Sequence, residues 1–350
     1  FASYISNVLP ELGEENMEQS TFFQFLQFRL GKEWDLEDPF SQMEFMLQKD
    51  FSPLEEIRRE GVRYKSSLHF KKLIDQYIGH LGKEGLVFRS LSFRSEIFVS
   101  SGEIEDYFYS RDPSLPIPNR IQLVKEWLLE KLEEKEREEK DHEWVEEERE
   151  LLSKEDYVRA YKKLQREKRF TENTFNDFER EEQLLSEWIV KRRIQPLKRK
   201  IKNLAFLHVP AIYRGIFSFR PKGKPGLPDR FREMGEITAA SMEKGKLLYE
   251  DITPYLYLKD KLEGRPSYSS IKHLFIDEAQ DYSPFQLAYI KEIFPYSRMT
   301  LLGDGNQSIY AYTKEKGSVL EDPEEIFPPE DSEKMVLLKS YRSTKQITDF

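Results

Sequence analysis

The stretch Ile271–Asp281, IKHLFIDEAQD, decides the fold of this chain. Its apolar run, Leu274–Ile276, predicts a strand buried on both faces, as in a parallel sheet flanked by helices. Ligands of such sheets bind beyond the carboxyl ends of the strands, where Asp277, Glu278 and Gln280 would lie. Hydrolysis of a nucleoside triphosphate needs a carboxylate for Mg²⁺ and a group that activates water. A solvated acidic turn would explain the Asp-Glu pair equally well, so the neighbouring segments decide.

Two further strand ends carry polar clusters of the same kind. Met299–Leu302 reads as a buried strand and runs into GDGNQSIY at residues 303–310. Met335–Leu338 reads as another and runs into Lys339 and SYRST at residues 340–344. The carboxyl ends of neighbouring parallel strands share one edge of a sheet, so the second cluster is expected to lie next to the first. The fold class predicted is α/β.

Composition excludes several classes of protein. The 350 residues are 38% hydrophobic and 34% charged, with no cysteine, which rules out disulfides and thiolate metal sites. The five histidines are scattered, and no apolar run approaches the roughly 18–20 residues of a membrane span. No signal peptide is visible, which points to the cytoplasm. The chain starts without Met and stops inside a predicted helix, so we expect a fragment of a longer protein.

The segment from Lys32 to about Ser241 has a different, helical character. Leu86–Phe93 and Glu96–Val99 predict two strands, and the remainder predicts helices. Three of these are long. Residues 119–152 hold no Pro or Gly and would span about 50 Å as one unbroken helix, with a middle that projects away from any core. The other two are residues 156–168 and 171–207, the latter interrupted at Pro196. A further helix is predicted over residues 236–262.

Charge is distributed unevenly along these helices. The formal net charge is −9, but residues 130–150 hold 12 acidic and 5 basic side chains, a net of −7. Lys191–Lys202, KRRIQPLKRKIK, is strongly basic. Two interpretations stay open: a solvated face of a helical bundle, or a protruding arm that docks on another macromolecule.

The three strand-end clusters resemble motifs II, III and IV of the UvrD/Rep group of superfamily-one helicases. Phe1–Leu9 is similar to the segment after motif Ia of that group, and Thr21-Phe22 to the start of motif Ib. Five segments closely resemble the HelD-like branch, bacterial factors that release RNA polymerase: YISNVLPELGE, NRIQLVKEWLL, VPAIYR, EDITPYLYLKD and IDEAQDYSPFQ.

The resemblance implies a role for each site residue. Asp277 would hold Mg²⁺, and Glu278 would be the general base that activates water. Gln280 and Gln307 would sense the terminal phosphate of ATP. Arg342 would stabilise charge on the transferred phosphoryl group, for which Lys is a poor substitute.

Other residues carry weaker implications. Tyr341 would lie beside the base of ATP, and Asp304 would shape the pocket or serve only as a capping carboxylate. Nucleic acid would be contacted by four residues: Thr21, Phe22, Tyr310 and Tyr312. Plain packing explains the two tyrosines equally well.

The sequence departs from the family pattern in two places. Many members continue motif III with a Trp that stacks on single-stranded bases, whereas this chain reads Tyr310-Ala311-Tyr312-Thr313. Base stacking contributes about 1–3 kcal/mol per base, so its loss weakens the case for processive unwinding. No GxxxxGK[ST] loop occurs in the chain. We expect that loop to precede Phe1, and the chain alone to be inactive.

The combined prediction is a RecA-like (P-loop NTPase) parallel-sheet domain interrupted by a large helical arm. The first RecA-like domain would comprise residues 1–32 and 241–330, the arm residues 33–240, and the start of a second RecA-like domain residues 331–350. Cofactors would be ATP and Mg²⁺, and partners RNA polymerase and DNA, for a monomer in the bacterial cytoplasm. Two alternatives are a UvrD/Rep-type duplex-unwinding helicase and, for the isolated chain, a non-enzymatic partner-binding module.

Overall fold

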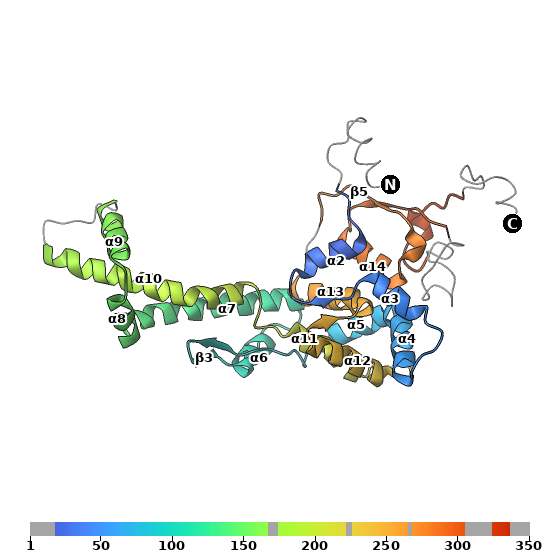
Figure 1. The fold of residues 1–350 in the computed structure, drawn as a ribbon, viewed down its shortest axis with the longest axis horizontal. Helices are drawn as coiled ribbons and strands as arrows, with labels where there is room; N and C mark the ends of the chain where they lie inside the picture. The colour runs from blue at the N-terminus through green and yellow to red at the C-terminus, as the bar shows by residue number, and fades with distance from the viewer. Residues whose placement is uncertain (1–17, 167–173, 222–225, 265–267, 305–323, 337–350) are drawn as a thin grey trace, which may run out of the picture. The chain divides into compact units, whose positions relative to one another are not determined.

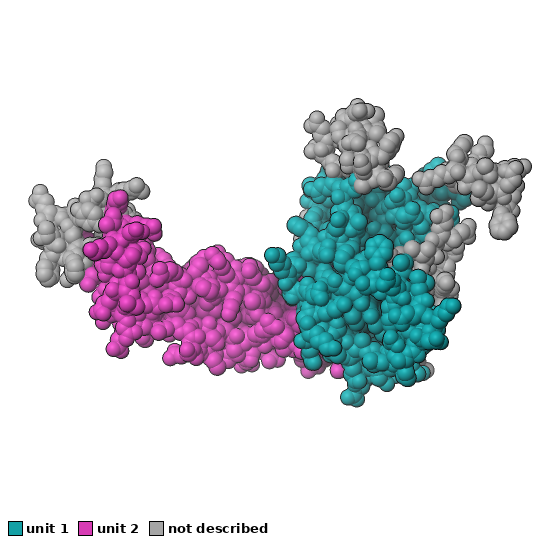
Figure 2. Space-filling view, in the orientation of Figure 1, with its two compact units in different colours: residues 1–72, 226–254, 266–350 teal, residues 73–225, 255–265 magenta. Residues whose placement is uncertain are grey.

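The structure is a computed structural model that describes residues 18–166, 174–221, 226–264, 268–304 and 324–336 (Figure 1). The chain divides into two compact units (Figure 2). Unit 1 comprises residues 1–72, 226–254 and 266–350, and unit 2 comprises residues 73–225 and 255–265. The boundaries expected at residues 32 and 240 both lie within unit 1, and the domain limits stay predictions.

Unit 1 begins with helices whose caps were visible in the sequence. Helix α2 (Phe22–Leu30) starts at Thr21, whose side chain accepts a hydrogen bond from the Gln24 N–H, while the Gln24 side chain accepts one from the Thr21 N–H. Helices α3 (Pro39–Met46) and α4 (Pro53–Lys65) follow, and α5 (Leu68–Leu81) crosses from unit 1 into unit 2 after Lys72. A capping box at Ser52 starts α4 in the same way. Short side chains that bond the first turn thus set both starting points.

A short parallel sheet joins two distant segments of unit 1. Strand β1 (Asp35–Leu36) pairs with β4 (Lys246–Leu247), which lies between α12 (Phe231–Glu243) and α13 (Tyr249–Glu263). The single helix predicted over residues 236–262 is therefore wrong. Gly245 adopts a φ of +74°, a left-handed conformation that glycine takes without steric cost, and this ends α12 before the strand begins.

The stretch that opened the sequence analysis forms the second parallel pair of unit 1. Strand β5 (His273–Ile276) pairs with β6 (Arg298–Leu301) in register, from His273 opposite Arg298 to Ile276 opposite Leu301. Helix α14 (Pro284–Ile293) connects them. The expectation of burial on both faces is wrong, since Phe275 is 66% exposed and stacks on the His273 ring. Among the described residues β5 has no strand partner besides β6.

In unit 2 a hairpin follows α5, and the strand predicted over residues 86–93 is formed only at its end, Leu91–Phe93. Strands β2 (Leu91–Phe93) and β3 (Glu96–Val99) are antiparallel and connected at Arg94-Ser95, with Arg94 at a φ of 54°. Helix α6 (Ser101–Tyr109) follows and packs on α7 (Ile117–Glu138). Val124, Leu128 and Leu132 of α7 are buried.

The long helix predicted over residues 119–152 is broken. A 3₁₀ turn (η1, Glu139–Asp141) separates α7 from α8 (Glu143–Glu150), and His142 is extended. The Glu139 carboxylate is buried, pairs with Lys135 at 2.8 Å and accepts a hydrogen bond from the Trp144 indole N–H at 2.5 Å. The break lets Trp144 and Val145 bury their side chains, so this part of the segment belongs to a core after all.

Helix α10 (Thr174–Lys202) follows α9 (Lys154–Arg166) and lies beside α7, α8 and α9 (Figure 1). It continues through Pro196, contrary to the predicted interruption. Proline inside a helix costs about 3 kcal/mol. Buried apolar residues on both sides of Pro196, Ile194 and Leu197 among them, offset that cost by packing. Unit 2 also contains α11 (Val209–Gly215) and a 3₁₀ turn, η2 (Ile216–Ser218).

The described part of the chain is thus mixed α/β and mostly helical, with small sheets. A larger parallel sheet does not occur among the described residues. The strand predicted over residues 335–338 is not formed where the structure describes it, at Met335 and Val336, which are exposed. No helix in the described ranges combines the length and apolarity needed to cross a membrane.

Candidate functional site

Two exposed carboxylates follow β5 directly. Asp277 and Glu278 are the first residues after the strand, and both are exposed. Glu278 has φ 51° and ψ 41°, a left-handed conformation that costs a non-glycine residue of order 1–3 kcal/mol. Asp277 stabilises this turn, since its Oδ1 accepts a hydrogen bond from the Glu278 N–H at 3.0 Å. The turn presents both carboxylates to solvent at the strand end.

Gln280 joins this turn to the end of β6. It lies in a 3₁₀ turn (η3, Ala279–Asp281) and is only 2% exposed. Its Nε2 donates to Glu278 Oε2 at 2.6 Å, and its Oε1 accepts from the backbone N–H of Asp304 at 3.1 Å. One buried amide therefore fixes the Glu278 carboxylate relative to the residues after β6. The predicted meeting of the first two polar clusters is present here.

Backbone hydrogen bonds extend this junction beyond the strands. The Leu302 N–H donates to Ile276 O at 2.8 Å, and the Ala279 N–H donates to Leu302 O, also at 2.8 Å. The two strand ends thus stay paired up to the polar residues. Asp304 is exposed, and its backbone N–H is held by Gln280, whereas its predicted role in the pocket stays a prediction.

Two of the four residues predicted to contact nucleic acid, Thr21 and Phe22, are described by the structure and lie at the start of α2. The Thr21 hydroxyl caps that helix, and the Phe22 ring packs on Tyr282, with centroids 5.5 Å apart. Tyr282 directly follows the DEAQD turn, so Phe22 lies beside the candidate site. Their contact with nucleic acid stays a prediction. The other predicted residues lie outside the described ranges: Gln307, Tyr310, Tyr312, Tyr341 and Arg342.

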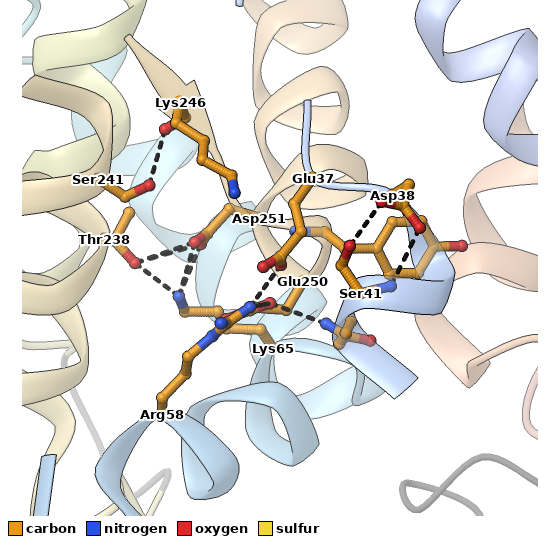
Figure 3. Close-up of polar contacts among 12 residues, drawn as sticks. Glu37, Asp38, Ser41, Arg58, Lys65, Thr238, Ser241, Lys246, Glu250 and Asp251 are labelled. Carbon is orange, nitrogen blue, oxygen red and sulfur yellow. Dashed lines mark hydrogen bonds and ion pairs between the residues drawn. The ribbon is translucent and has the colours of Figure 1, made fainter. Parts of the chain in front are cut away.

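Unit 1 also contains a buried ionic network that the sequence analysis missed (Figure 3). Arg58 of α4 contacts two carboxylates, Glu37 after β1 and Glu250 of α13, and its Nε lies 3.0 Å from Glu250 Oε1. Gln42 of α3 donates to Glu250 Oε2 at 2.7 Å. Burial alone would raise the pKa of Glu250, but attraction to Arg58 and Lys65 outweighs burial and lowers this pKa.

Lys65 extends the network two turns further along α4. Its Nζ lies 2.7 Å from Asp251 Oδ1 and donates to the Thr238 hydroxyl at 2.6 Å (Figure 3). Thr238 of α12 donates in turn to Asp251 Oδ2 at 3.1 Å. The network therefore clamps α4, α12 and α13 together with charges that are shielded from solvent.

A chain of hydrogen bonds runs from this network to the candidate site. Glu37 accepts from the Tyr249 N–H at 3.1 Å, and the Tyr249 hydroxyl accepts from Gln286 Nε2 at 3.3 Å. Gln286 forms a capping box with Ser283, which starts α14 two residues after Asp281. The network thus supports the helix that follows the carboxylate turn. A sequence signal existed: Glu250 and Asp251 stand directly before the mostly apolar run ITPYLYL of α13.

The donor set at the strand ends suits a magnesium-bound nucleotide better than a free ion. Mg²⁺ is usually held by one or two carboxylates together with substrate phosphates and water. Asp277 supplies an exposed carboxylate of that kind. In the described part of the chain no three His, Cys, Asp or Glu side chains are grouped as a metal site. Asp277 with a phosphate ligand would therefore be the fitting arrangement.

Comparison with known proteins agrees with this geometry. The model of the UvrD/REP helicase N-terminal domain matches residues 5–327. Within the chain, 93 residues, or 26% of its length, are 34% identical to a putative ATP-dependent DNA helicase of Acanthamoeba polyphaga mimivirus. The chain spans 12% of that viral protein.

Proposed function

Because the chain belongs to the UvrD/REP helicase family, we propose that it forms part of an ATP-dependent DNA helicase-family motor. Family membership implies a RecA-like fold, of which β5 and β6 would be two neighbouring strands. The observation that carries the proposal is the Gln280 bridge between Glu278 and Asp304. It unites two polar strand ends at the edge where parallel sheets bind ligands.

Each residue of this edge has a defined task in the proposal. Asp277 would hold Mg²⁺, which brings charge neutralisation to the phosphates of bound ATP. Glu278 would accept a proton from the attacking water. Gln280 would position the Glu278 carboxylate, and Asp304 would anchor Gln280 through its backbone. Gln307, Tyr341 and Arg342 would complete the site as the family resemblance implies.

The test uses the full-length protein that carries this sequence. We expect Glu278→Gln to lower the turnover number of ATP hydrolysis by about 100-fold or more while ATP still binds, since general bases contribute about 10²–10⁴. Asp277→Asn should weaken Mg²⁺-dependent ATP binding itself. Glu330→Gln, an exposed change outside the site, serves as control and should leave turnover unchanged. Normal hydrolysis by Glu278→Gln would overturn the assignment.

A finer proposal concerns the partner. The HelD-like resemblance supports binding to RNA polymerase and its ATP-linked release, in the bacterial cytoplasm and by a monomer. The helices α7 to α10 would be the docking arm. Their acidic surface is exposed, for example at Glu134, Glu138 and Glu146, and would occupy a basic channel that otherwise holds nucleic acid.

Charge reversal tests this partner. We expect the triple variant Glu134→Lys, Glu138→Lys and Glu146→Lys to weaken binding of purified RNA polymerase in a pull-down or by light scattering. A matched control reverses three exposed glutamates of unit 1, Glu324, Glu330 and Glu333, and should bind normally. Equal binding by the first variant and the wild type would discard the acidic docking surface.

Two rival functions predict other results. A UvrD/Rep-type helicase would unwind a DNA duplex robustly without polymerase, which a strand-displacement assay on the full-length protein measures. A non-enzymatic partner-binding module would bind its partner with or without ATP, and the Glu278→Gln change would have no effect. Intact DEAQ, GDGNQ and YRS clusters support an enzyme over the module.

A further inference from the structure

A small cavity lies beside the ionic network of unit 1, where α3, α4, α13 and α14 meet. Its volume is about 10 Å³. That is close to the smallest volume, about 10–15 Å³, that holds one water molecule. Polar side chains dominate the lining, and those that matter here are all buried, at 7% exposure or less: Gln42, Lys65, Glu250, Thr253, Ser283 and Gln286. A cavity with polar walls binds water, whereas an apolar one stays dry.

The Thr253 hydroxyl in this wall needs a hydrogen-bond partner. Thr253 is 3% exposed, and among the described residues its Oγ1 has none. Inside a helix, a Thr hydroxyl often bonds the backbone carbonyl three or four residues earlier. Thr253 makes no such bond and lines the cavity, where its hydroxyl can meet a ligand. Burying a hydroxyl without any partner is unfavourable, so the residue itself points to an occupant.

Pro254 leaves a backbone acceptor in the same wall. Proline has no N–H, so the Glu250 carbonyl lacks the donor that residue 254 supplies in a regular helix. Glu250 and Pro254 both line the cavity, and the gap in the hydrogen bonds of α13 therefore lies at its wall. Buried backbone carbonyls in proteins are nearly always paired, with ordered water where no protein donor reaches them.

The α14 side of the cavity supplies a donor. Gln286 Oε1 accepts from the Ser283 N–H at 2.9 Å, and Gln286 Nε2 donates to the Tyr249 hydroxyl at 3.3 Å. An amide nitrogen carries two hydrogens, so one remains for a ligand. A monatomic ion serves only donors or only acceptors, whereas water serves both kinds of group. The Lys65 ammonium in the wall further disfavours a cation.

We propose that this cavity binds one ordered water molecule. The water accepts hydrogen bonds from the Thr253 hydroxyl and Gln286 Nε2, and it donates one to the Glu250 carbonyl. About three hydrogen bonds are typical of a buried water. The water thereby joins the proline gap of α13 to the capping box of α14, which starts at Ser283. The site goes beyond the proposed motor function and does not depend on ATP hydrolysis.

A high-resolution crystal structure of the protein tests the site directly. We expect a density peak at about 2.7–3.2 Å from Thr253 Oγ1, Gln286 Nε2 and Glu250 O, the distances of ordinary hydrogen bonds. A cavity without such a peak would overturn the proposal. A peak with oxygen ligands at about 2.0–2.6 Å would overturn it as well, because those distances belong to Mg²⁺ or Ca²⁺.

Thr253→Val tests the hydrogen bond in solution, since Val has nearly the same shape as Thr but no hydroxyl. With the water bound, the variant loses a hydrogen bond, and the equilibrium constant for unfolding in a urea titration should rise about fivefold. If the Thr253 hydroxyl has no partner, its removal should leave unfolding unchanged or make it less favourable. Either of these results would contradict the proposal.

Thr253→Ser is the matched control, because it keeps the hydroxyl and loses only a methyl group. Its crystal structure should retain the density peak, whereas the peak should weaken or disappear in Thr253→Val. Equal peaks in the two variants would refute the hydrogen bond to residue 253. If Thr253→Val does not fold, the peaks of the wild type and Thr253→Ser still decide whether the water is bound.

Discussion

Replacing Lys65 with Met removes the ammonium group that pairs with the buried Asp251 carboxylate. Both side chains are nearly inaccessible, at 2% and 1% exposure, and their charges are 2.7 Å apart. At an effective dielectric constant of about 20, that attraction is on the order of 6 kcal/mol. Burying Met does not carry the cost of removing the Lys65 ammonium group from water, so the net loss of stability is smaller than this attraction. Breaking a buried pair from one side typically costs about 3–5 kcal/mol, and we expect this loss of unfolding free energy.

A double-mutant cycle separates the pair from general packing. Asp251→Leu alone should also destabilise, because Lys65 is then buried without this carboxylate. The double variant, Lys65→Met with Asp251→Leu, should be less destabilised than the sum of the two by about 2 kcal/mol or more. Lys72→Met is the matched control, since Lys72 and Glu325 form an exposed pair, at 63% and 58%, that contributes under about 1 kcal/mol.

Urea unfolding followed by circular dichroism gives the free energies, and amide hydrogen exchange locates the effect. Exchange should accelerate in α4 and α13, which the network clamps, more than in α7 or α10 of unit 2. The reasoning fails if Lys65→Met costs no more than Lys72→Met. It also fails if the effects of the two single changes simply add.

Three further predictions follow from particular contacts. Folding lowers the pKa of Glu250 from its ordinary value of 4.5, so its stabilisation is complete above that pH and is lost as the pH falls through the folded value. Acid unfolding of Glu250→Gln should accordingly show a weaker pH dependence than that of the wild type. Gly215→Ala should destabilise by about 1–3 kcal/mol in a melting assay, because the new Cβ would collide with the Tyr77 hydroxyl, which donates to Ile212 O. Thr21→Ala should cost about 1 kcal/mol and speed amide exchange at the start of α2, since Gln24 loses its capping partner, and unchanged exchange would contradict that role.

The carboxylate turn could be predicted because its signals are local. Apolar β5 followed at once by Asp277 and Glu278 marks a strand end, and the same pattern recurs after β6. Parallel pairing then brings the two ends together, which the Gln280 bridge confirms for Glu278 and Asp304. Capping residues such as Ser283 fix helix starts through neighbours three residues away, so these starts depend on local sequence.

Features that depend on distant contacts were missed. The break after α7 depends on burying Trp144, and the continuity of α10 through Pro196 depends on packing along its apolar side. Neither is visible in a helical pattern of residues. The ionic network joins Glu37, Arg58 and Glu250, which are up to 213 positions apart in the chain. Single-sequence patterns carry no information on which charges meet at such separations.

In the candidate site, the exposed polar groups are accessible to a ligand and the buried polar group positions them. Asp277 and Glu278 remain exposed, so a ligand can reach their carboxylates without prior desolvation of the site. Gln280 is buried, and its hydrogen bonds to Glu278 and Asp304 help to hold Glu278 in a left-handed turn that the backbone alone disfavours. The backbone strain is confined to Glu278, whereas the hydrogen bond that restrains its side chain is anchored at the end of β6 through the Asp304 N–H. Any ligand that moves the residues after β6 would therefore act on the orientation of Glu278 through the Gln280 amide.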